Sequence, residues 1–401
     1  MEIPYIRVGV TYYKLVDKPL ASGDAIRIRQ PWNSQTIRLD HGEKYLKKVP
    51  NYDGLCTIPN HIDYHRVIKN HWNVYEPLPI SPNQGDYQVT YEFMNHIFGD
   101  QLLIGLDYLT ILYRFPQRLL PILCLVSKER KTGKTTFLNY LKVLFGHNMT
   151  QNTNDDFRSN FNSEWASKLI VAIDEVLLDK REDSEKIKHL STARLFKSEA
   201  KGKDRNEVEF FGKFILCSND EEGFIKVDER EIRYWVVKVS PLISEDVDLL
   251  KKLQIEAPAF LHLLKTREII SPEKTRMWFT ESQIRTKALM ALIRNNTPKL
   301  EMELMHIFQE VFEKYELDEF NFCISDLIPF LRFNSLKGDR NEIRKLVKKW
   351  ELNVQPNSYT YTRIAISSDG TFYMIPGAKG RFFTITKDKL DELMNGKSNH
   401  L

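Results

Sequence analysis

Between residues 119 and 240, short apolar runs alternate with amphipathic segments. Four of the runs are rich in β-branched residues, as are strands that are buried on both faces of a sheet. These runs are Ile122–Val126, Leu169–Ile173, Phe214–Cys217 and Trp235–Val239. The segments Thr135–Phe145 and Glu185–Phe196 have the apolar spacing of helices. Strands that alternate with helices predict an α/β fold, with a mostly parallel sheet covered by helices on both sides.

A phosphate-binding loop is expected after the first run. The segment Ser127–Thr136 joins this run to an amphipathic helix, which is the strand–loop–helix setting of a P-loop. Backbone N–H groups of the loop and of the first helical turn, Thr136 included, point at phosphate oxygens in such a loop. Gly133 lets the backbone turn close to these oxygens, Lys134 reaches the β- and γ-phosphates of ATP, and Thr135 ligates Mg²⁺.

One position departs from the P-loop pattern. Lys128 stands where the pattern GxxxxGK[ST] expects its first glycine. The remaining Gly-Lys-Thr is short enough to occur in an ordinary surface loop. The hypothesis of a nucleotide site therefore needs support from other parts of the chain.

Polar residues follow the second and third runs and give that support. Asp174 and Glu175 come directly after Leu169–Ile173, and Asn219 follows Phe214–Cys217 closely. Because the carboxyl ends of parallel strands meet at one edge of a sheet, these side chains should converge on the P-loop. We expect Asp174 to hold Mg²⁺, Glu175 to polarise the attacking water, and Asn219 to hydrogen-bond the γ-phosphate or that water. A solvated acidic pair and an Asx turn are the structural alternatives.

Two arginines precede the fourth run. Arg230 and Arg233 lie just before Trp235–Val239. In ring-shaped ATPases, an arginine offered to the γ-phosphate of a neighbouring subunit supplies transition-state charge. Surface ion pairing is the alternative role for each arginine. We favour Arg233 for the catalytic role because it immediately precedes the expected strand. With the P-loop and the polar strand ends, the arginines predict nucleotide hydrolysis.

A basic hairpin is expected between the second and third runs. Leu195–Ala200 and Asn206–Phe211 can pair as two strands, with residues 201–205 at the tip. Its cations are Lys197, Lys201, Lys203 and Arg205. Cations on a narrow tip suit contact with nucleic-acid phosphates, which does not depend on base sequence. A solvated lysine-rich turn is the alternative.

Together these residues resemble the superfamily-3 helicases, an AAA+ branch found in viruses, phages and plasmids. The resemblance covers about residues 90–240. Gly133–Thr135, Ile173–Glu175 and Cys217–Asn219 are similar to the family's motifs A, B and C. The basic hairpin resembles motif B′, which carries lysines into the central channel of a ring, and the two arginines resemble the arginine-finger motif. Within the family, the chain most resembles the helicase domains of phage and mobile-element primase–helicases.

The resemblance implies a DNA helicase that depends on ATP and Mg²⁺ and moves 3′-to-5′ on single-stranded DNA for a phage or mobile element. The expected partners are single-stranded or forked DNA, further copies of the chain in a ring (a hexamer), and a separate primase. Residues 1–90 show no paired-acid metal motif of a primase. Two other functions stay open. One is an ATP-switched loader or origin-recognition protein without processive unwinding, and the other is a P-loop regulator of a protein partner.

Five regions are expected along the chain. They are an N-terminal region of unassigned role (1–90), a helical collar (91–118), the AAA+ core (119–240), a helical connector with boundaries at Pro258 and Pro272 (241–298), and a winged-helix-like domain (299–401). In the last region, three helices precede the hairpin Tyr359–Ile366 with Gly370–Ile375. The helix Asp339–Trp350 carries a basic face suited either to DNA or to plain solvent exposure.

Composition limits the setting rather than the function. The formal net charge of +4 over 401 residues is too small to identify a partner. The four cysteines stand singly, without a CxxC pair, which favours a reducing compartment. Cys56 with His61, His65 and His71 lacks the paired-ligand spacing of a zinc site. No apolar run approaches the ~20 residues that cross a bilayer, and the first residues are unlike a targeting leader. We therefore expect a cytoplasmic protein without a membrane partner, in a bacterial host if a phage encodes it.

Overall fold

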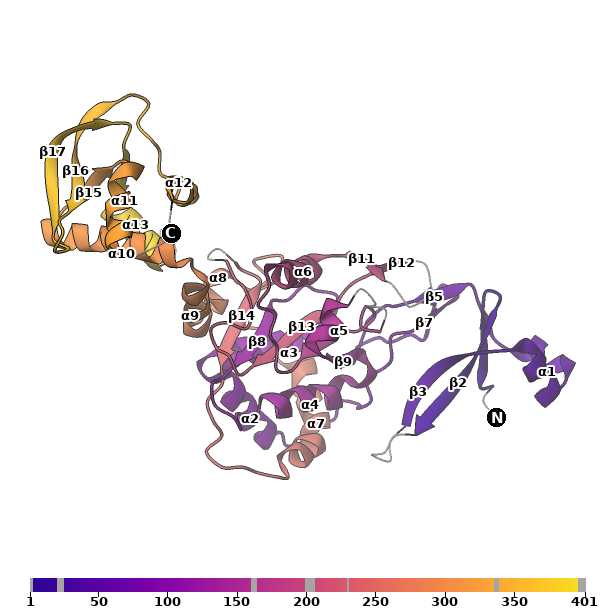
Figure 1. Cartoon of the computed structure of the whole chain (residues 1–401). Helices are drawn as coiled ribbons and strands as arrows, with labels where there is room; N and C mark the ends of the chain where they lie inside the picture. Colours follow the sequence, from indigo (N-terminus) through magenta and orange to yellow (C-terminus); the bar gives the residue numbers. More distant parts are fainter. Residues whose placement is uncertain are drawn as a thin grey trace. The chain divides into compact units, whose positions relative to one another are not determined.

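The computed structural model describes residues 3–19, 25–159, 164–198, 206–228, 231–334 and 339–395. The chain divides into two compact units (Figure 1). The first unit comprises Met1–Lys226 and Ile232–Leu292, and the second comprises Val227–Glu231 and Ile293–Leu401. Each unit has a hydrophobic core of its own.

A five-stranded sheet forms the centre of the first unit. Its strands are β8 (Ile122–Val126), β9 (Met149–Asn152), β10 (Ile170–Ile173), β13 (Lys213–Ser218) and β14 (Tyr234–Lys238). They lie in the order β14-β8-β13-β10-β9, and every neighbouring pair is parallel. The residues of β8, β10 and β13 are all buried, as in a sheet covered on both faces. The parallel α/β sheet expected from the apolar runs is confirmed.

Helices cover both faces of this sheet. On one face lie α2 (Gln88–Phe98), α3 (Leu102–Arg114), α4 (Lys134–Phe145) and α7 (Leu249–Thr266). They share one hydrophobic cluster with alternate strand residues such as Leu123 and Leu125 of β8. Helix α4 forms because Phe137, Leu141 and Leu144 recur on one face at helical spacing, and all three are fully buried. On the opposite face lies α6 (Arg181–Thr192), which packs against β13 (Figure 1).

Two boundaries differ from the sequence prediction. Pro258 does not end a helix, because α7 continues through it. A proline removes one helical hydrogen bond, but the apolar face of α7, with Ala257 and Phe260 fully buried, packs on α2, α3 and α4. This packing outweighs the local cost. The helix expected at Glu185–Phe196 is α6, which begins four residues earlier and ends at Thr192.

The first unit contains four further small elements after residue 140. They are α5 (Asn154–Arg158), the hairpin strands β11 (Leu195–Ser198) and β12 (Asn206–Glu209), and α8 (Glu281–Ile284). Strands β11 and β12 pair antiparallel, as the sequence predicts. Helix α9 (Lys287–Asn296) crosses the division between the two units, and the 3-10 helices are η1 (Glu43–Lys48), η2 (Gly99–Gln101) and η3 (Gly146–Asn148).

The N-terminal part of the first unit is mostly β-structure. Its strands are β1 (Tyr5–Val8), β2 (Thr11–Pro19), β3 (Ala25–Trp32), β4 (Asn51–Tyr52), β5 (Gly54–Cys56), β6 (Val67–Ile68) and β7 (His71–Asn73). They form two sheets, in the orders β3-β2-β1-β4 and β5-β7-β6. Helix α1 (Ser34–His41) packs Ile37 into a small cluster with Tyr5 and Val49. The sequence pattern indicated only short β runs here.

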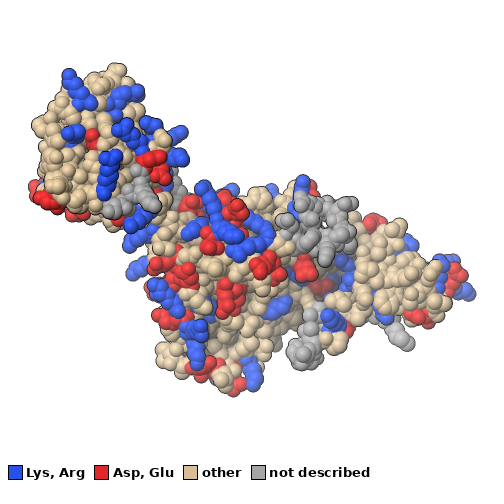
Figure 2. Space-filling model, in the orientation of Figure 1, with Lys and Arg blue, Asp and Glu red and all other residues tan. Residues whose placement is uncertain are grey.

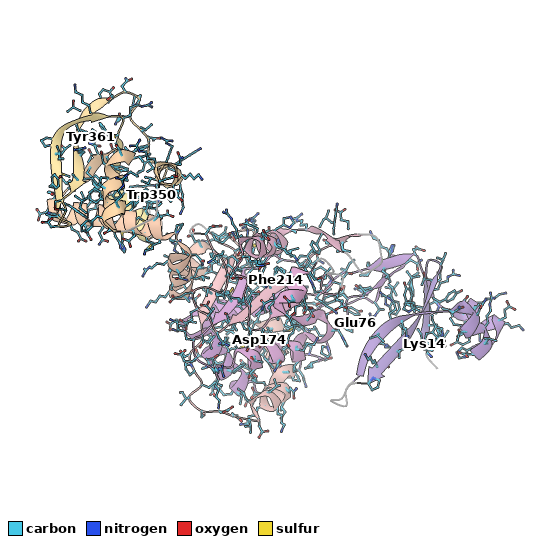
Figure 3. All side chains as sticks on the ribbon, in the orientation of Figure 1. Lys14, Glu76, Asp174, Phe214, Trp350 and Tyr361 are labelled. Carbon is cyan, nitrogen blue, oxygen red and sulfur yellow. The ribbon has the colours of Figure 1, made fainter. Side chains whose placement is uncertain are left out.

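The second unit combines helices with two small sheets. Its elements are α10 (Lys299–Tyr315), β15 (Glu319–Phe322), α11 (Ile324–Phe333), α12 (Arg340–Lys349), β16 (Tyr359–Ile366), β17 (Phe372–Gly380), β18 (Phe383–Thr386) and α13 (Lys387–Asn395). Strands β16 and β17 form the predicted hairpin. Buried Glu301 of α10 accepts hydrogen bonds from Lys349 Nζ (2.7 Å) and Trp350 Nε1 (2.8 Å), which fixes the end of α12. Figure 3 labels Trp350.

The surface of the second unit carries many cations. Lys and Arg side chains are spread over its visible face (Figure 2). On α12, Arg340, Arg344 and Lys348 are exposed, whereas Ile343 and Val347 are buried. The helix is therefore amphipathic with a basic outer face, as predicted. Within the described parts of the chain, no helix is both long enough and apolar enough to cross a membrane.

Candidate nucleotide-binding site

Three strand ends meet at one edge of the central sheet. Strand β13 lies between β8 and β10, and all three run parallel. The loop after β8, Asp174 after β10 and Asn219 after β13 therefore share the carboxyl edge of the sheet (Figures 1 and 3). Ligands of parallel α/β sheets bind at this edge.

Gly133 is required by both conformation and space. It caps α4 with φ of 85° and ψ of 0°, in the left-handed region that favours glycine. A Cβ atom there would lie 3.1 Å from Cε2 of Phe93, which is buried on α2. His96 of α2 also donates from Nε2 to the carbonyl oxygen of Thr132 (3.0 Å). Helix α2 thus packs against the loop and fixes its last turn before α4.

Lys134 connects the loop to the end of β13. Its ammonium group donates to Asn219 Oδ1 (3.2 Å) and to Thr132 Oγ1 (3.1 Å). The side chain is buried, and this burial lowers the pKa of Lys134, while Cys217 and nearby carboxylates, Asp174 first among them, act in the opposite direction. A buried cation held between two neutral oxygens is well prepared for an anionic ligand, because it has lost water without gaining a bonded counter-charge.

Thr135 connects the loop to the end of β10. Its hydroxyl donates to Asp174 Oδ2 (2.9 Å). The other carboxylate oxygen of Asp174 accepts the backbone N–H of Glu175 (3.0 Å). Thr136 follows in the first turn of α4, so its backbone N–H belongs to the helix N-terminus, where anions bind favourably. The five residues predicted to bind the nucleotide and metal, Gly133, Lys134, Thr135, Thr136 and Asp174, therefore lie together.

Glu175 stands in a strained backbone conformation with its side chain exposed. Its φ is 52°, in the left-handed region that a glutamate seldom adopts. Asn154 at the start of α5 holds this turn from both sides: its Nδ2 donates to the Glu175 carbonyl oxygen (3.2 Å), and its Oδ1 accepts the Leu177 N–H (2.9 Å). Strain of this kind persists where neighbouring groups enforce it. Asn154 was not predicted from the sequence, because an asparagine in a polar segment has no motif around it.

The departure at Lys128 has a local explanation. Lys128 is not among the described residues with positive φ, so its backbone does not need a glycine. Its N–H donates to Glu221 Oε1 (3.0 Å), and its ammonium group lies 3.8 Å from Glu222 Oε1. Glu221 also pairs with Lys238 Nζ (3.0 Å). The lysine side chain thus points at the acids that follow β13, an arrangement that the sequence did not predict.

Arg233 lies at the opposite edge of the sheet. Its carbonyl oxygen accepts the N–H of Ile122, the first residue of β8 (2.7 Å). A strand of this length separates it from the P-loop by on the order of 16 Å. Arg233 and Lys134 of one chain therefore do not share a site. Arg230 lies outside the described residues.

The predicted hairpin cations are only partly described. Lys197 lies on β11 with an exposed side chain. Lys201, Lys203 and Arg205 lie outside the described residues. The pairing of β11 with β12 supports a hairpin at this position, and the role of its cations stays a prediction.

The donor set at the sheet edge fits a magnesium–nucleotide complex. Among the described residues, no three or more His, Cys, Asp and Glu side chains gather to hold a metal ion by themselves. Mg²⁺ typically takes one or two protein oxygens and completes its shell with phosphate oxygens and water. Thr135 and Asp174 offer such oxygens, and their side chains are hydrogen-bonded to each other.

Comparisons with known proteins support the α/β core. A family model described as Family of unknown function (DUF5906) matches residues 125–233, a range that contains the P-loop, Asp174, Asn219 and Arg233. The chain is 23% identical over 184 residues to the DNA Primase-polymerase of Nitratiruptor phage NrS-1. That alignment covers 43% of this chain and 25% of the phage protein, so the chain matches about a quarter of its relative's length.

Solved structures extend the similarity to nearly the whole chain. The apo structure of the NrS-1 C terminal region (305-718) has a TM-score of 0.63 at 14% identity, covering 93% of this chain and 96% of that one. A second apo structure of the same region, in its A form, has a TM-score of 0.62 at 14% identity with the same coverage. At this identity the similarity establishes a shared fold. The chain is thus a mixed α/β protein with a P-loop-like core, built like the C-terminal region of a phage primase-polymerase.

Proposed function

We propose that this chain is an ATP-driven motor that moves on single-stranded DNA, a helicase of the superfamily-3 type. The observation that carries the proposal is the convergence of Lys134, Thr135, Asp174 and Asn219, through two hydrogen bonds, at the ligand-binding edge of a parallel sheet. The shared fold with a region of a phage primase-polymerase supports a role in phage or mobile-element replication.

The residues divide the chemistry among them. ATP with Mg²⁺ supplies the bond to be cleaved, with Lys134 and the loop N–H groups holding its phosphates and Thr135 and Asp174 holding the ion. Glu175, beside the metal ligand Asp174, accepts a hydrogen bond from the attacking water and polarises it. Asn219 orients that water or the γ-phosphate. Glu175 is exposed to solvent in the strained turn that Asn154 holds.

The ring is the second part of the proposal. Because Arg233 is at the opposite sheet edge from Lys134 of the same chain, it reaches a triphosphate only from a neighbouring copy. This supports a closed assembly, expected to be a hexamer, in which each site is completed by an arginine of the next subunit. Arg230 is the alternative donor.

The contacts with DNA are the third part of the proposal. The hairpin β11–β12, with Lys197 on a strand and Lys201, Lys203 and Arg205 at the tip, would contact DNA phosphates in the ring's channel and move with hydrolysis. We assign α2 and α3 to a collar. We assign the second unit to a winged-helix-like domain with α12 as its DNA-facing helix. The expected direction of movement is 3′-to-5′. Primer synthesis is left to a separate primase.

Strand displacement on a forked DNA substrate tests this proposal. The wild-type protein with ATP and Mg²⁺ should release the displaced strand, and Lys201→Ala with Lys203→Ala should abolish both unwinding and DNA-stimulated hydrolysis while nucleotide binding stays intact. Lys251→Ala with Lys252→Ala removes the same charge from exposed positions of α7 and should leave unwinding unchanged. Unwinding by the hairpin variant would disprove the hairpin assignment. Tight DNA binding without any strand release would favour the loader instead.

A further inference from the structure

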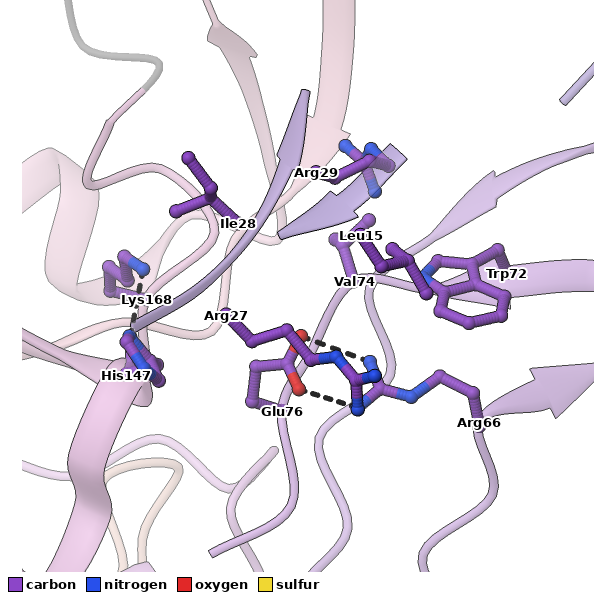
Figure 4. Close-up of a pocket in the computed structure, with 10 residues that line it drawn as sticks. All are labelled: Leu15, Arg27, Ile28, Arg29, Arg66, Trp72, Val74, Glu76, His147 and Lys168. Atoms are coloured by element: carbon purple, nitrogen blue, oxygen red, sulfur yellow. Dashed lines mark hydrogen bonds and ion pairs between the residues drawn. The ribbon is translucent and has the colours of Figure 1, made fainter. Parts of the chain in front are cut away.

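A basic cavity of about 450 Å³ lies in the first unit, and none of its lining residues belongs to the nucleotide site. Its walls come from the hairpin β2–β3, from the segment around β6 and β7, and from residues beside the central sheet (Figure 4). Its volume is within the usual range of ligand-binding pockets, roughly 300–1,000 Å³.

Positive charge dominates the lining. The ten lining residues include four that are always or usually cationic, Arg27, Arg29, Arg66 and Lys168, against one carboxylate, Glu76. Three of the cations, Arg29, Arg66 and Lys168, lie on different sides of the cavity (Figure 4). His147 also lines the cavity, and burial together with Lys142 and Lys168 lowers its pKa, so it adds no charge at neutral pH.

Two of these cations are desolvated without a bonded counter-charge. Burial lowers the pKa of Arg29 and the pKa of Lys168. Nε of Arg29 is shielded from solvent and has no hydrogen-bond partner among the described residues, and its guanidinium lies 5.1 Å from the Tyr13 ring centroid. Lys168 Nζ donates to a neutral group, the carbonyl oxygen of His147 (2.8 Å). A partly buried cation in this condition is costly, and an incoming anion offsets the cost.

The remaining groups indicate which part of a nucleotide would enter. Arg66 forms a two-pronged ion pair with Glu76, at 3.0 Å and 2.5 Å. Its guanidinium lies 5.2 Å from the Trp72 ring centroid, and Tyr52 packs against the same indole at 5.2 Å between centroids. The aromatic surface of Trp72 is therefore already occupied, so it offers little stacking area to a base. The cavity suits phosphate oxygens rather than bases.

The charge of the first 52 residues supports a polyanionic ligand. Residues 1–52 contain nine Lys and Arg and five Asp and Glu, a net +4, which equals the formal charge of the entire chain. The other residues are balanced overall. A long-range positive field of this kind attracts a strand of many phosphates more strongly than it attracts a single small anion.

We propose that this cavity is a second nucleic-acid site, which grips the phosphodiester backbone of a single strand outside the hairpin channel. Arg29 and Lys168 bind phosphate oxygens, and the ion pair with Glu76 fixes the position of the Arg66 guanidinium. Such contacts do not depend on base sequence. This inference adds a contact to the proposed motor, but it depends on charge and shape alone. DNA binding at this cavity should therefore require neither bound nucleotide nor ATP hydrolysis.

Fluorescence anisotropy of a labelled single-stranded oligonucleotide, measured without nucleotide at several salt concentrations, tests the site. Arg29→Gln with Lys168→Gln should weaken binding about tenfold at low salt and reduce the slope of log K against log salt by about 1.4, since each single-strand phosphate contact contributes about 0.7. Lys18→Gln with Lys44→Gln removes the same charge from exposed N-terminal positions outside the cavity and should keep most of the affinity.

A variant that is expected to raise DNA affinity distinguishes an effect on the site from loss of folding. Glu76→Gln removes the one carboxylate that lines the cavity and should tighten DNA binding, which a misfolded protein would not do. Wild-type affinity and salt slope in the Arg29→Gln, Lys168→Gln variant would overturn the proposal. The proposal would also be overturned if this variant lost binding to a fluorescent mononucleotide while its DNA binding stayed unchanged. A change in oligomeric state alone would overturn it too, because the cavity would then hold an acidic segment of another copy of the chain. Absence of ATP hydrolysis in the wild type would contradict the motor but not this site.

Discussion

His61 shows how a single residue of this protein responds to its surroundings. Its Nδ1 donates to the carbonyl oxygen of Tyr113 (2.7 Å), and its Nε2 accepts from the hydroxyl of Tyr75 (2.6 Å). The imidazole also packs against the rings of Tyr75, Tyr113 and Phe145. Both nitrogens are thus satisfied in the neutral form. A second proton would place a positive charge in this buried aromatic pocket.

Acid should therefore destabilise the first unit through His61. Burial lowers the pKa of His61 to about 4, from about 6.5 in an unfolded chain. The unfolded state binds the proton first, so His61's contribution to stability is fully present above about pH 6.5 and is lost as pH falls toward 4. The loss approaches about 3 kcal/mol. Urea denaturation at pH 7 and at pH 4.5 measures it.

His61→Gln is the matched variant for this measurement. It keeps a hydrogen-bonding side chain but does not titrate, so its unfolding free energy should change less between the two pH values than that of the wild type. An equal pH dependence in both proteins would show that another group controls the acid response.

At the scale of elements, the turn between β10 and α6 depends on α5. Asn154 at the start of α5 is bonded to both sides of the turn that carries Glu175, and it is only partly buried. We expect Asn154→Ala to release this turn while the core stays folded. Because displacement of a catalytic group by about 1 Å costs on the order of 100-fold in rate, kcat for ATP should fall roughly tenfold to 100-fold with little change in nucleotide affinity.

Steady-state hydrolysis together with nucleotide titration checks this expectation. Asn139→Ala, a similar change at a partly exposed position of α4, should leave both quantities near the wild-type values. A rise in the dissociation constant with kcat unchanged would mean that Asn154 supports binding rather than the chemistry.

The elements differ in how well the sequence predicts them. Strands β8, β10 and β13 are buried on both faces, so each appears in the sequence as an unbroken apolar run. Strand β9, Met149–Asn152, is an edge strand with polar residues, and the spacing from Lys134 to Asp174 indicated only that one more strand fits there. The sequence pattern also predicted a helix boundary at Pro258 that is wrong, because α7 continues through this proline. Its packing against other helices, not the local sequence, determines where it ends.

The same distinction applies to the two candidate sites. The convergence of Lys134, Asp174 and Asn219 could be predicted, because parallel topology brings strand ends to one edge. The basic cavity could not be predicted, because its residues come from distant segments of the N-terminal sheets and the central core, and no motif connects Arg29 with Lys168. Asn154 and Glu221 likewise act through contacts that only the folded chain reveals.

At the scale of the whole molecule, the proposed ring makes each site a property of two chains. Lys134→Ala removes the phosphate-binding lysine of a subunit, and Arg233→Ala removes the arginine that it offers to its neighbour. Each variant alone should be inactive. A mixture should regain part of the activity, since some interfaces then pair an intact Lys134 with an intact Arg233.

Titration of one variant into the other, followed by ATP turnover, measures this effect. At equal amounts, random assembly leaves about a quarter of the interfaces intact, so turnover should approach that fraction of the wild-type rate if interfaces act independently. A mixture as inactive as its components would contradict the sharing of sites through Arg233.

The central claim is that the edge formed by Lys134, Asp174 and Asn219 cleaves a nucleoside triphosphate. Phosphate release from ATP, with Mg²⁺ and single-stranded DNA present, tests it most directly. We predict turnover by the wild type, a loss on the order of 100-fold to 1,000-fold in Lys134→Ala, and a near-normal rate in Lys128→Ala, whose side chain points away from the loop toward Glu222. Undiminished hydrolysis by Lys134→Ala, or none by the wild type with any nucleoside triphosphate, would contradict the account.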